Sequence, residues 1–244
     1  AAIHVLVKKT NMAIYAGGNR ANPDKEIPAK LGAQFGLSQL DDNMGADDGI
    51  TSLKVASGQW RGGYIPYTDK PIHWHTDGYY NPPDQQIRAL LLHCVSPAAK
   101  GGENALLDHE IAYIHLRDSN PDYVAALMAN DVMSIPANIE NGKEIRPVRT
   151  GPVFSVMPDG SLHMRYTART RSIDWKDNPV TRAAIKTLAD FLNSDSSCIY
   201  RATLQSGQGL ISNNVLHDRS GFEESADAKR LLYRLRYYQR IAGT

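Results

Sequence analysis

The sequence has few of the cysteines that are typical of secreted, disulfide-stabilised proteins. It contains two cysteines, Cys94 and Cys198, in 244 residues, too few for a disulfide framework. Cys94 lies within the apolar run ALLLHCV, which is typical of a free buried thiol. Thiols that stay reduced favour a reducing compartment, so a cytoplasmic location is predicted.

The sequence also lacks the marks of membrane and nucleic-acid proteins. No apolar run approaches the roughly 20 residues that span a bilayer. The formal net charge is +1, so the charge balance indicates neither a nucleic acid nor an anionic membrane as partner. The first residues, AAIHVLVKKT, lack a basic-then-apolar signal pattern, and without an initial Met the N-terminal segment is predicted to be incomplete. A homo-oligomer is compatible with this composition.

Most of the chain has the pattern of short strands and turns, and we expect one domain over residues 1–244. Asn141-Gly142 and Asp159-Gly160 predict hairpin turns, each between strand-like residues. Many short strands with few helices indicate a mainly β sandwich or barrel with flanking helices. Further strands are predicted at residues 89–95, 198–204, 209–216 and 230–238.

Helical insertions are predicted near residues 108–130 and 178–193. Asp108 and Asn120 are suitable N-caps for two helices, the second with a proline at its first position. Asn178 and the proline after it open the clearest helix, in which apolar residues recur at helical spacing.

The stretch HWHTDGYY, residues 73–80, offers three possible metal ligands. With eight histidines, one His-x-Asp or His-x-Glu triplet is expected about once by chance, so His75-Thr76-Asp77 alone is weak evidence. On a strand, however, residues i and i+2 point to the same face, so His75 and Asp77 could bind one ion. A second histidine from a distant strand would complete a two-His-one-carboxylate site of the kind that binds Fe(II) with open positions.

Other histidine patterns compete with this one. His73 and His75 also share a strand face, as in cupin-type sites, but tyrosines stand where such sites have a glutamate. His109-Glu110 is not followed by a histidine at the spacing of a zinc protease. His93, inside the apolar run, is interpreted as a hydrogen-bonded core residue.

The segment NNVLHDRSGF, residues 213–222, supplies the candidate third ligand, His217, at the end of an apolar strand. Arg230 follows thirteen residues later, in KRLLYRLRYY. Alternation places Arg230 and Arg234 on one strand face, ~13 Å apart at ~3.3 Å per residue. A guanidinium that faces the interior needs a partner, and its planar fork suits a carboxylate. The alternative is an arginine at the rim that pairs with Asp or Glu.

The ordered series HTD, GGEN (Gly101–Asn104), VLHDRSGF and Arg230 resembles the Fe(II)- and 2-oxoglutarate-dependent oxygenases. The likeness is to the branch that contains taurine dioxygenase, clavaminate synthase and gamma-butyrobetaine hydroxylase. It runs from about Ile65 to Arg240. The segment MRYTARTRSIDW, residues 164–175, and the His-to-Arg interval fit the butyrobetaine type best.

The resemblance implies a double-stranded β-helix (jelly-roll) core, with Fe(II) held by His75, Asp77 and His217. It implies that Arg230 binds the distal carboxylate of 2-oxoglutarate. Arg234, on the same predicted strand face, is also predicted to bind the co-substrate, with an ion pair at the rim as its alternative. Taurine-type enzymes have a threonine where Asn104 stands, and the Asn104 amide could still donate a hydrogen bond.

The implied reaction uses O2 and couples decarboxylation of 2-oxoglutarate to succinate with attack on an unactivated C–H of a small polar molecule. The carboxylate of Asp77 favours hydroxylation or desaturation, because related halogenases lack it. Three alternatives stay open: a protein- or peptide-modifying oxygenase of the same fold, a non-catalytic metal-binding barrel, and a zinc hydrolase.

Two groups of residues bear on the substrate. Aromatic residues around the HTD segment could cage a quaternary ammonium, although packing in a β core explains them as well. A basic cluster could receive an anionic group, with its three arginines on one strand face, or be a solvated face. The aromatic residues are Tyr64, Tyr67, Trp74, Tyr79 and Tyr80, and the arginines are Arg165, Arg169 and Arg171.

Overall fold

The computed structural model describes residues 2–18, 23–41, 48–56, 64–169 and 173–244. The chain divides into two compact units, each of which is described by itself. The sheet unit comprises Ala1–Ile72, Ile87–Leu106 and Arg201–Thr244. The helical unit comprises His73–Gln86 and Leu107–Tyr200.

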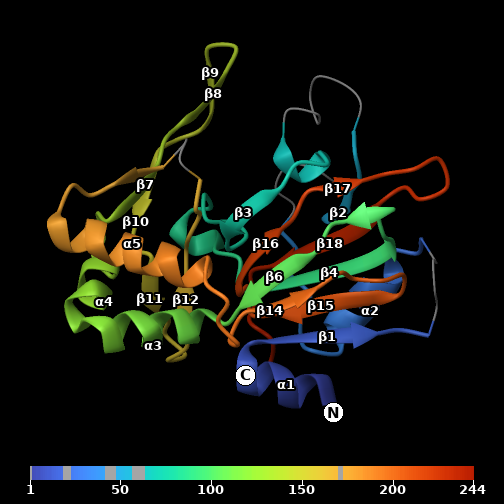
Figure 1. The fold of residues 1–244 in the computed structure, drawn as a ribbon, viewed down its shortest axis with the longest axis horizontal. Coiled ribbons are helices and arrows are strands. Elements are labelled where there is room, and N and C mark those ends of the chain that lie inside the picture. Colours follow the sequence, from blue (N-terminus) through green and yellow to red (C-terminus); the bar gives the residue numbers. More distant parts are fainter. Residues whose placement is uncertain (1, 19–22, 42–47, 57–63, 170–172) are drawn as a thin grey trace. The chain divides into compact units, whose positions relative to one another are not determined.

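A five-stranded sheet with the order β1-β15-β4-β18-β2 forms the centre of the sheet unit (Figure 1). Its neighbouring strands pair antiparallel. β4 lies in the middle, and all its residues but the last are buried, as predicted from its unbroken apolar run. The strands are β1 (Met12–Ala16), β2 (Ile50–Leu53), β4 (Ala89–Ser96), β15 (Gln208–Ser212) and β18 (Leu231–Tyr237).

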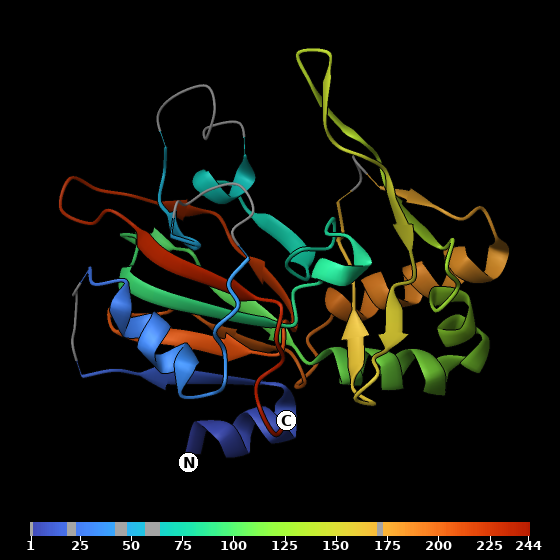
Figure 2. The ribbon, with the colours of Figure 1, turned by 180° about the vertical axis from the view of Figure 1, so that it is seen from behind.

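Alternate residues of β18 pack into different clusters on the two faces of this sheet. Tyr233 and Leu235 join one cluster, together with residues of α1 (Ala2–Thr10) and α2 (Glu26–Ala33). Figure 2 shows α2 lying over this face. Leu232 joins the other cluster. That cluster also includes Leu106 of a second sheet, in which β6 (Asn104–Leu107) lies between β14 (Tyr200–Ala202) and β16 (Leu216–Arg219).

A short ribbon fastens the end of the second sheet. β5 (Lys100–Gly101) pairs antiparallel with β17 (Phe222–Glu223). A Cβ on Gly101 would lie only 2.4 Å from the carbonyl oxygen of Gly221, and the φ of Gly101 is +78°. Only glycine fits this close approach. The short 3-10 helix Ile65–Tyr67 precedes β3 (Ile72–His75) in the chain.

Three helices of the helical unit confirm the predicted N-caps. They are α3 (His109–Ser119), α4 (Pro121–Leu127) and α5 (Pro179–Leu192). The side chains of Asp108, Asn120 and Asn178 each accept hydrogen bonds from backbone N–H groups in the first turn of their helix. Each cap satisfies a donor that has no partner inside the helix.

Both predicted hairpins are present in the helical unit. Asn141 and Gly142 have φ angles of +52° and +77°, as a tight two-residue turn requires, and the hairpin extends away from the three helices in Figure 1. A three-stranded sheet has the order β10-β7-β13. The hairpins are β8 (Asn138–Glu140) with β9 (Lys143–Arg146), and β11 (Phe154–Val156) with β12 (Leu162–Met164). The remaining elements are β3 (Ile72–His75), β7 (Met133–Ile135), β10 (Arg149–Gly151), β13 (Asp174–Trp175) and the 3-10 helix Pro83–Gln85.

Several smaller predictions are also settled. His93 is a buried core residue, with its Nδ1 3.0 Å from the hydroxyl oxygen of Tyr15. Cys94 is free and buried, and Cys198 is free and exposed. Within the described ranges, no helix combines the length and the apolar character needed to cross a membrane.

Candidate active site

The HTD segment is held against another part of the helical unit. His75 forms an antiparallel bridge with Thr167. Thr76 donates its backbone N–H to the carbonyl of Tyr166, 3.0 Å away, and its Oγ1 accepts the N–H of Tyr166 at 3.1 Å. Thr76 is fully buried. These bonds fix the backbone on both sides of Thr76, and they set the directions of His75 and Asp77.

His75 and Asp77 lie together, as predicted from their spacing. The Nε2 of His75 is 3.8 Å from Oδ1 of Asp77, and Asp77 is 5% exposed. Two atoms that each lie about 2.1 Å from one ion can be at most about 4.2 Å apart. The pair therefore fits ligation of a single metal ion.

The imidazole of His75 is held in the form that a metal needs. Its Nδ1 lies 2.9 Å from the carbonyl oxygen of His73. A carbonyl can only accept, so Nδ1 carries the proton and the lone pair is on Nε2. His73 contributes this backbone carbonyl, while its own side chain is exposed. Such bonds orient metal-binding histidines in general.

His217 shows the same arrangement in the sheet unit. It is buried on β16, and its Nδ1 lies 2.9 Å from the carbonyl oxygen of Val215. The lone pair is again on Nε2. Both predicted histidine ligands thus use the carbonyl two residues earlier in the chain to fix the same tautomer.

Asn104 and Asp218 fasten β6 to the strand that carries His217. The side-chain amide of Asn104 donates to the backbone carbonyl of Asp218 at 2.8 Å, and Asp218 Oδ1 accepts the N–H of Ala105 at 2.8 Å. Burial raises the pKa of Asp218. Asn104 therefore has a structural partner, and its predicted contact with a co-substrate stays a prediction.

Arg230 presents a buried positive charge. It is 5% exposed, and no described residue accepts a hydrogen bond from its guanidinium. Its Cζ lies 5.0 Å from the centre of the Phe222 ring, and a Cβ on Gly102 would lie 3.6 Å from its Nε. Burial lowers the pKa of Arg230 to about 10, so it stays charged at neutral pH. A carboxylate would supply the missing acceptor.

Arg219 is a second buried arginine near the Phe222 ring, and it was not predicted from the sequence. Its Cζ lies 4.9 Å from the centre of the Phe222 ring. It donates to the carbonyls of Thr68, at 2.8 Å, and Lys70. Burial, and then repulsion from Arg230, lower its pKa to about 10. Its position two residues after the predicted ligand His217 could have indicated that Arg219 belongs to the site.

Arg234 lies on β18 opposite Leu92 and Thr51, and it is half-buried. The clusters on the two faces of β18 agree with alternation from Leu231 onward, whereas Arg230, predicted to share the face of Arg234, precedes the strand. Its role toward a co-substrate stays a prediction.

The three arginines predicted to share a strand face do not do so. β12 ends at Met164, and the next residue, Arg165, is buried. It donates to the backbone carbonyls of Met133, Arg149 and Gly151. Arg169 is exposed, and Arg171 lies outside the described residues.

The five aromatic residues also separate into groups. Tyr67 and Trp74 are buried, which agrees with core packing. Tyr79 and Tyr80 are half-buried, and their rings contact each other edge to face at 5.2 Å. Tyr64 is exposed.

Comparison with known families agrees with these features. The family described as "Taurine catabolism dioxygenase TauD, TfdA family" matches residues 22–236, most of the chain. The chain belongs to this family. The predicted relationship to Fe(II)- and 2-oxoglutarate-dependent oxygenases is confirmed.

Two curated relatives carry the same name. A uridine-5'-phosphate dioxygenase of Amycolatopsis sp is 30% identical over 169 residues, which cover 67% of this chain and 60% of the relative. A uridine-5'-phosphate dioxygenase of Streptomyces sp is 27% identical over 173 residues, which cover 69% of this chain and 62% of the relative. The chain thus spans about three fifths of the length of these relatives.

A solved structure confirms the fold class. The non-heme iron oxygenase OrfP, in complex with Fe, succinate and (3S)-hydroxy-L-Arg, superimposes with a TM-score of 0.66 at 16% identity. The match covers 95% of this chain and 76% of that one. The fold is mainly β with flanking helices and a jelly-roll core.

Proposed function

We propose that this chain is an Fe(II)- and 2-oxoglutarate-dependent oxygenase that hydroxylates an unactivated C–H of a small polar molecule. In the balanced reaction, 2-oxoglutarate and O2 convert the substrate C–H to C–OH, with release of succinate and CO2. The two units would act as one oxygenase domain.

Arg230 is the observation that carries the proposal. A buried guanidinium with no acceptor among the described residues is costly unless a ligand supplies one. The distal carboxylate of 2-oxoglutarate matches its planar fork. The Phe222 ring lies beside the guanidinium, and the absence of a side chain at Gly102 leaves room next to its Nε. This packing would orient the fork before the co-substrate arrives.

His75, Asp77 and His217 are proposed to hold the iron together. The support is the fixed lone pair on Nε2 of each histidine and the closeness of His75 to Asp77. When bound, Fe(II) would supply the activation of dioxygen. The carbonyls of His73 and Val215 keep both imidazoles oriented and keep each proton on Nδ1.

The substrate is proposed to be a small anionic metabolite. Two relatives are named for action on uridine 5'-phosphate, which is an anion. The OrfP complex contains (3S)-hydroxy-L-Arg, which supports a small molecule as substrate but not its negative charge. A cytoplasmic setting remains part of the proposal, in agreement with two free cysteines.

An anaerobic absorption titration tests the proposal. Protein freed of metal is titrated with Fe(II) and then with 2-oxoglutarate, and a visible charge-transfer band is expected only after both additions. In Arg230→Ala the band should need at least about tenfold more 2-oxoglutarate, because a charge-assisted bidentate contact is lost.

Arg117→Ala is the matched control, because the exposed Arg117 pairs with its neighbour Asp118. It should give the wild-type titration. Melting curves of each protein show whether it is folded. If folded, Fe(II)-loaded wild type gave no band with 2-oxoglutarate, the oxygenase proposal would be wrong, and a zinc hydrolase or a binding module would take its place.

A further inference from the structure

Three arginines of the helical unit are not paired with any acidic side chain that the structure describes. Among the residues that the structure describes, no carboxylate pairs with Arg146, Arg149 or Arg169. Other exposed arginines of this unit do pair, as Arg117 does with Asp118 and Arg182 with Asp177. The cluster is therefore an excess of positive charge rather than a network of surface ion pairs.

Two tyrosines connect these arginines. Arg169 lies 3.3 Å from the hydroxyl of Tyr79, to which it donates. Tyr79 contacts Tyr80 edge to face. The Cζ of Arg146 lies 5.8 Å from the centre of the Tyr80 ring. Segments up to 90 residues apart thus meet at one place in this unit.

Arg149 has the most unusual environment of the three. Its Nε is buried without a hydrogen-bond partner among the described atoms. Its backbone carbonyl accepts from the buried guanidinium of Arg165, at 3.4 Å and 3.5 Å from the two terminal nitrogens. Arg165 also donates to Gly151, at the other end of β10. This buried arginine therefore fixes the strand that carries Arg149.

Arg146 adds a partly desolvated charge. Its terminal nitrogens donate to the carbonyls of Pro136, at 2.9 Å, and Pro147, at 3.3 Å. Burial lowers the pKa of Arg146, and the nearby charge of Arg149 lowers it further. An anion placed between the two would relieve this repulsion.

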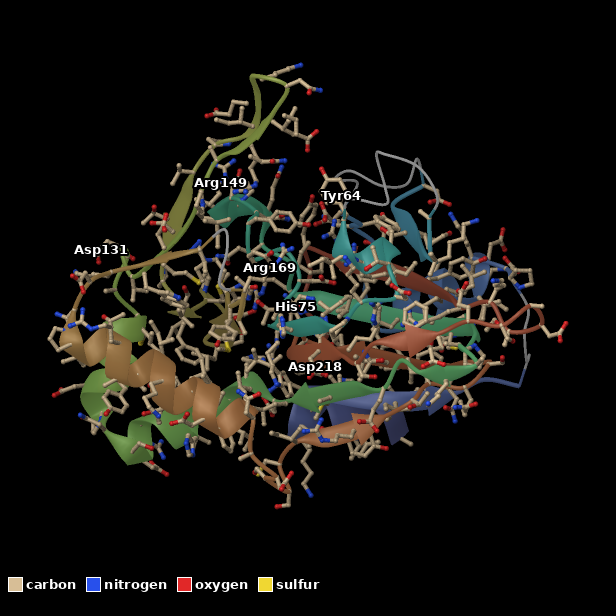
Figure 3. All side chains as sticks on the ribbon, turned by 45° about the horizontal axis from the view of Figure 1, so that its top comes forward. Tyr64, His75, Asp131, Arg149, Arg169 and Asp218 are labelled. Atoms are coloured by element: carbon tan, nitrogen blue, oxygen red, sulfur yellow. The ribbon has the colours of Figure 1, made fainter. Side chains whose placement is uncertain are left out.

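The cluster adjoins the proposed iron ligands of the same unit. Tyr79 follows Asp77 by two residues, and Arg169 follows Thr167, the bridge partner of His75, by two residues. In the view of Figure 3, Arg169 lies between His75 and Arg149. A ligand held by the arginines could extend toward the HTD segment.

We propose that Arg146, Arg149 and Arg169, with Tyr79 and Tyr80, receive the phosphate group of a phosphorylated small-molecule substrate. The inference rests on the proposed oxygenase function and gives its substrate a chemical class. A phosphate monoester carries up to two negative charges and three terminal oxygens, enough to accept from several guanidinium groups at once. A single carboxylate would leave much of this charge unbalanced.

Anaerobic calorimetry on protein loaded with Fe(II) and 2-oxoglutarate tests the inference. The probes are uridine 5'-phosphate, ribose 5-phosphate, uridine and inorganic phosphate. We expect uridine 5'-phosphate to bind wild type at least about tenfold more tightly than uridine, with inorganic phosphate as a competitor. Arg149→Gln should weaken the binding of uridine 5'-phosphate about tenfold, because a charge-assisted contact is lost. The double variant with both Arg146→Gln and Arg149→Gln should weaken it about a hundredfold.

Arg182→Gln is the matched control, since Arg182 lies on α5 and pairs with Asp177. It should leave the affinity for uridine 5'-phosphate unchanged. Binding of ribose 5-phosphate as tightly as the nucleotide would support a site that recognises phosphate alone. The inference fails if no phosphorylated probe binds wild type, if uridine binds as tightly as its phosphate, or if the double variant binds like wild type.

The charge-transfer band with Fe(II) and 2-oxoglutarate separates the two proposals. A band in wild type together with any of those failures would overturn the phosphate site and leave the oxygenase function standing. Absence of the band would overturn both. The same band in the variants shows that each is folded and loaded.

Discussion

Two arginine sites of this chain differ in almost every physical respect. In the sheet unit, the guanidinium of Arg230 is buried, lies 5.0 Å from one aromatic ring and immediately precedes the seven-residue strand β18. In the helical unit, Arg146 and Arg149 are half-buried and Arg169 is exposed. They come from a hairpin, a short strand and a segment without regular secondary structure.

The difference in burial between the two sites indicates how each would select its anion. A buried cation held by packed neighbours accepts a single shape and interacts strongly, because little water screens it. Half-exposed cations on short elements interact more weakly and tolerate variation in the rest of the ligand. The first suits a co-substrate that never changes, and the second suits a substrate of which only one group is recognised.

Asp77→Ala should have the largest effect, because it removes the chemistry without touching either arginine site. We expect turnover, measured as succinate release at saturating Fe(II), to fall at least about 1,000-fold, since a ligand of the metal is lost. The melting temperature should change little. Asp131→Ala, which removes an exposed carboxylate paired with Lys176 at 2.8 Å, should leave turnover unchanged. Survival of turnover in Asp77→Ala would show that the ligand assignment is wrong.

Arg230→Lys should separate the two sites. Lysine keeps the charge but loses the planar fork, so the KM for 2-oxoglutarate should rise about 10- to 100-fold. The KM of a phosphorylated substrate should change less than about threefold, because the two sites share no residue. Steady-state kinetics with each substrate varied in turn make the comparison. A parallel rise in both KM values would contradict the separation.

The local features of both units could be predicted from the sequence. The caps at Asp108, Asn120 and Asn178 and the turn at Asn141-Gly142 depend on neighbours a few residues away. The closeness of His75 and Asp77 was predicted from strand spacing, although β3 ends at His75 and Asp77 lies in the turn that follows.

Features that depend on distant contacts could not be predicted. Nothing in the sequence indicates that Tyr79 meets Arg169, and alternation wrongly placed Arg165 on an open face although the strand ends before it. The helix α1 was missed because it is short and has no acidic residue in its first turn. Its Val7 packs in the core, and such packing stabilises short helices more than propensity does.

Phe222→Leu tests whether the aromatic ring contributes to the binding of 2-oxoglutarate by Arg230. The ring lies near the guanidinium groups of both Arg219 and Arg230, and a cation–π contact contributes about 0.5–2 kcal/mol. We expect the KM for 2-oxoglutarate to rise about 3- to 10-fold. Phe191→Leu is the control, since that ring stacks on His115 in the helical unit. It should lower the melting temperature and leave this KM alone. Equal effects of the two variants on KM would mean that Phe222 acts only through stability.

Glu224→Gln should have the smallest effect, and it tests whether Arg230 is already neutralised. Glu224 Oε1 accepts the backbone N–H of Arg230 at 2.9 Å, a bond that a glutamine oxygen can keep. Its charge raises the pKa of Arg230, which burial sets at about 10. Removing that charge lowers this pKa, but near pH 7 the guanidinium stays protonated, so the KM for 2-oxoglutarate should change less than about twofold.

The pH dependence of the KM for 2-oxoglutarate shows in which direction Glu224 shifts the pKa of Arg230. In wild type the KM should stay flat through neutral pH and rise as the pH approaches about 10, where Arg230 loses its proton. In Glu224→Gln the rise should begin at lower pH, because the carboxylate no longer favours the charged form. If Glu224 instead neutralised the guanidinium directly, the variant would bind 2-oxoglutarate more tightly near pH 7. Arg230 would then not be the buried, uncompensated cation that distinguishes the sheet unit from the helical unit.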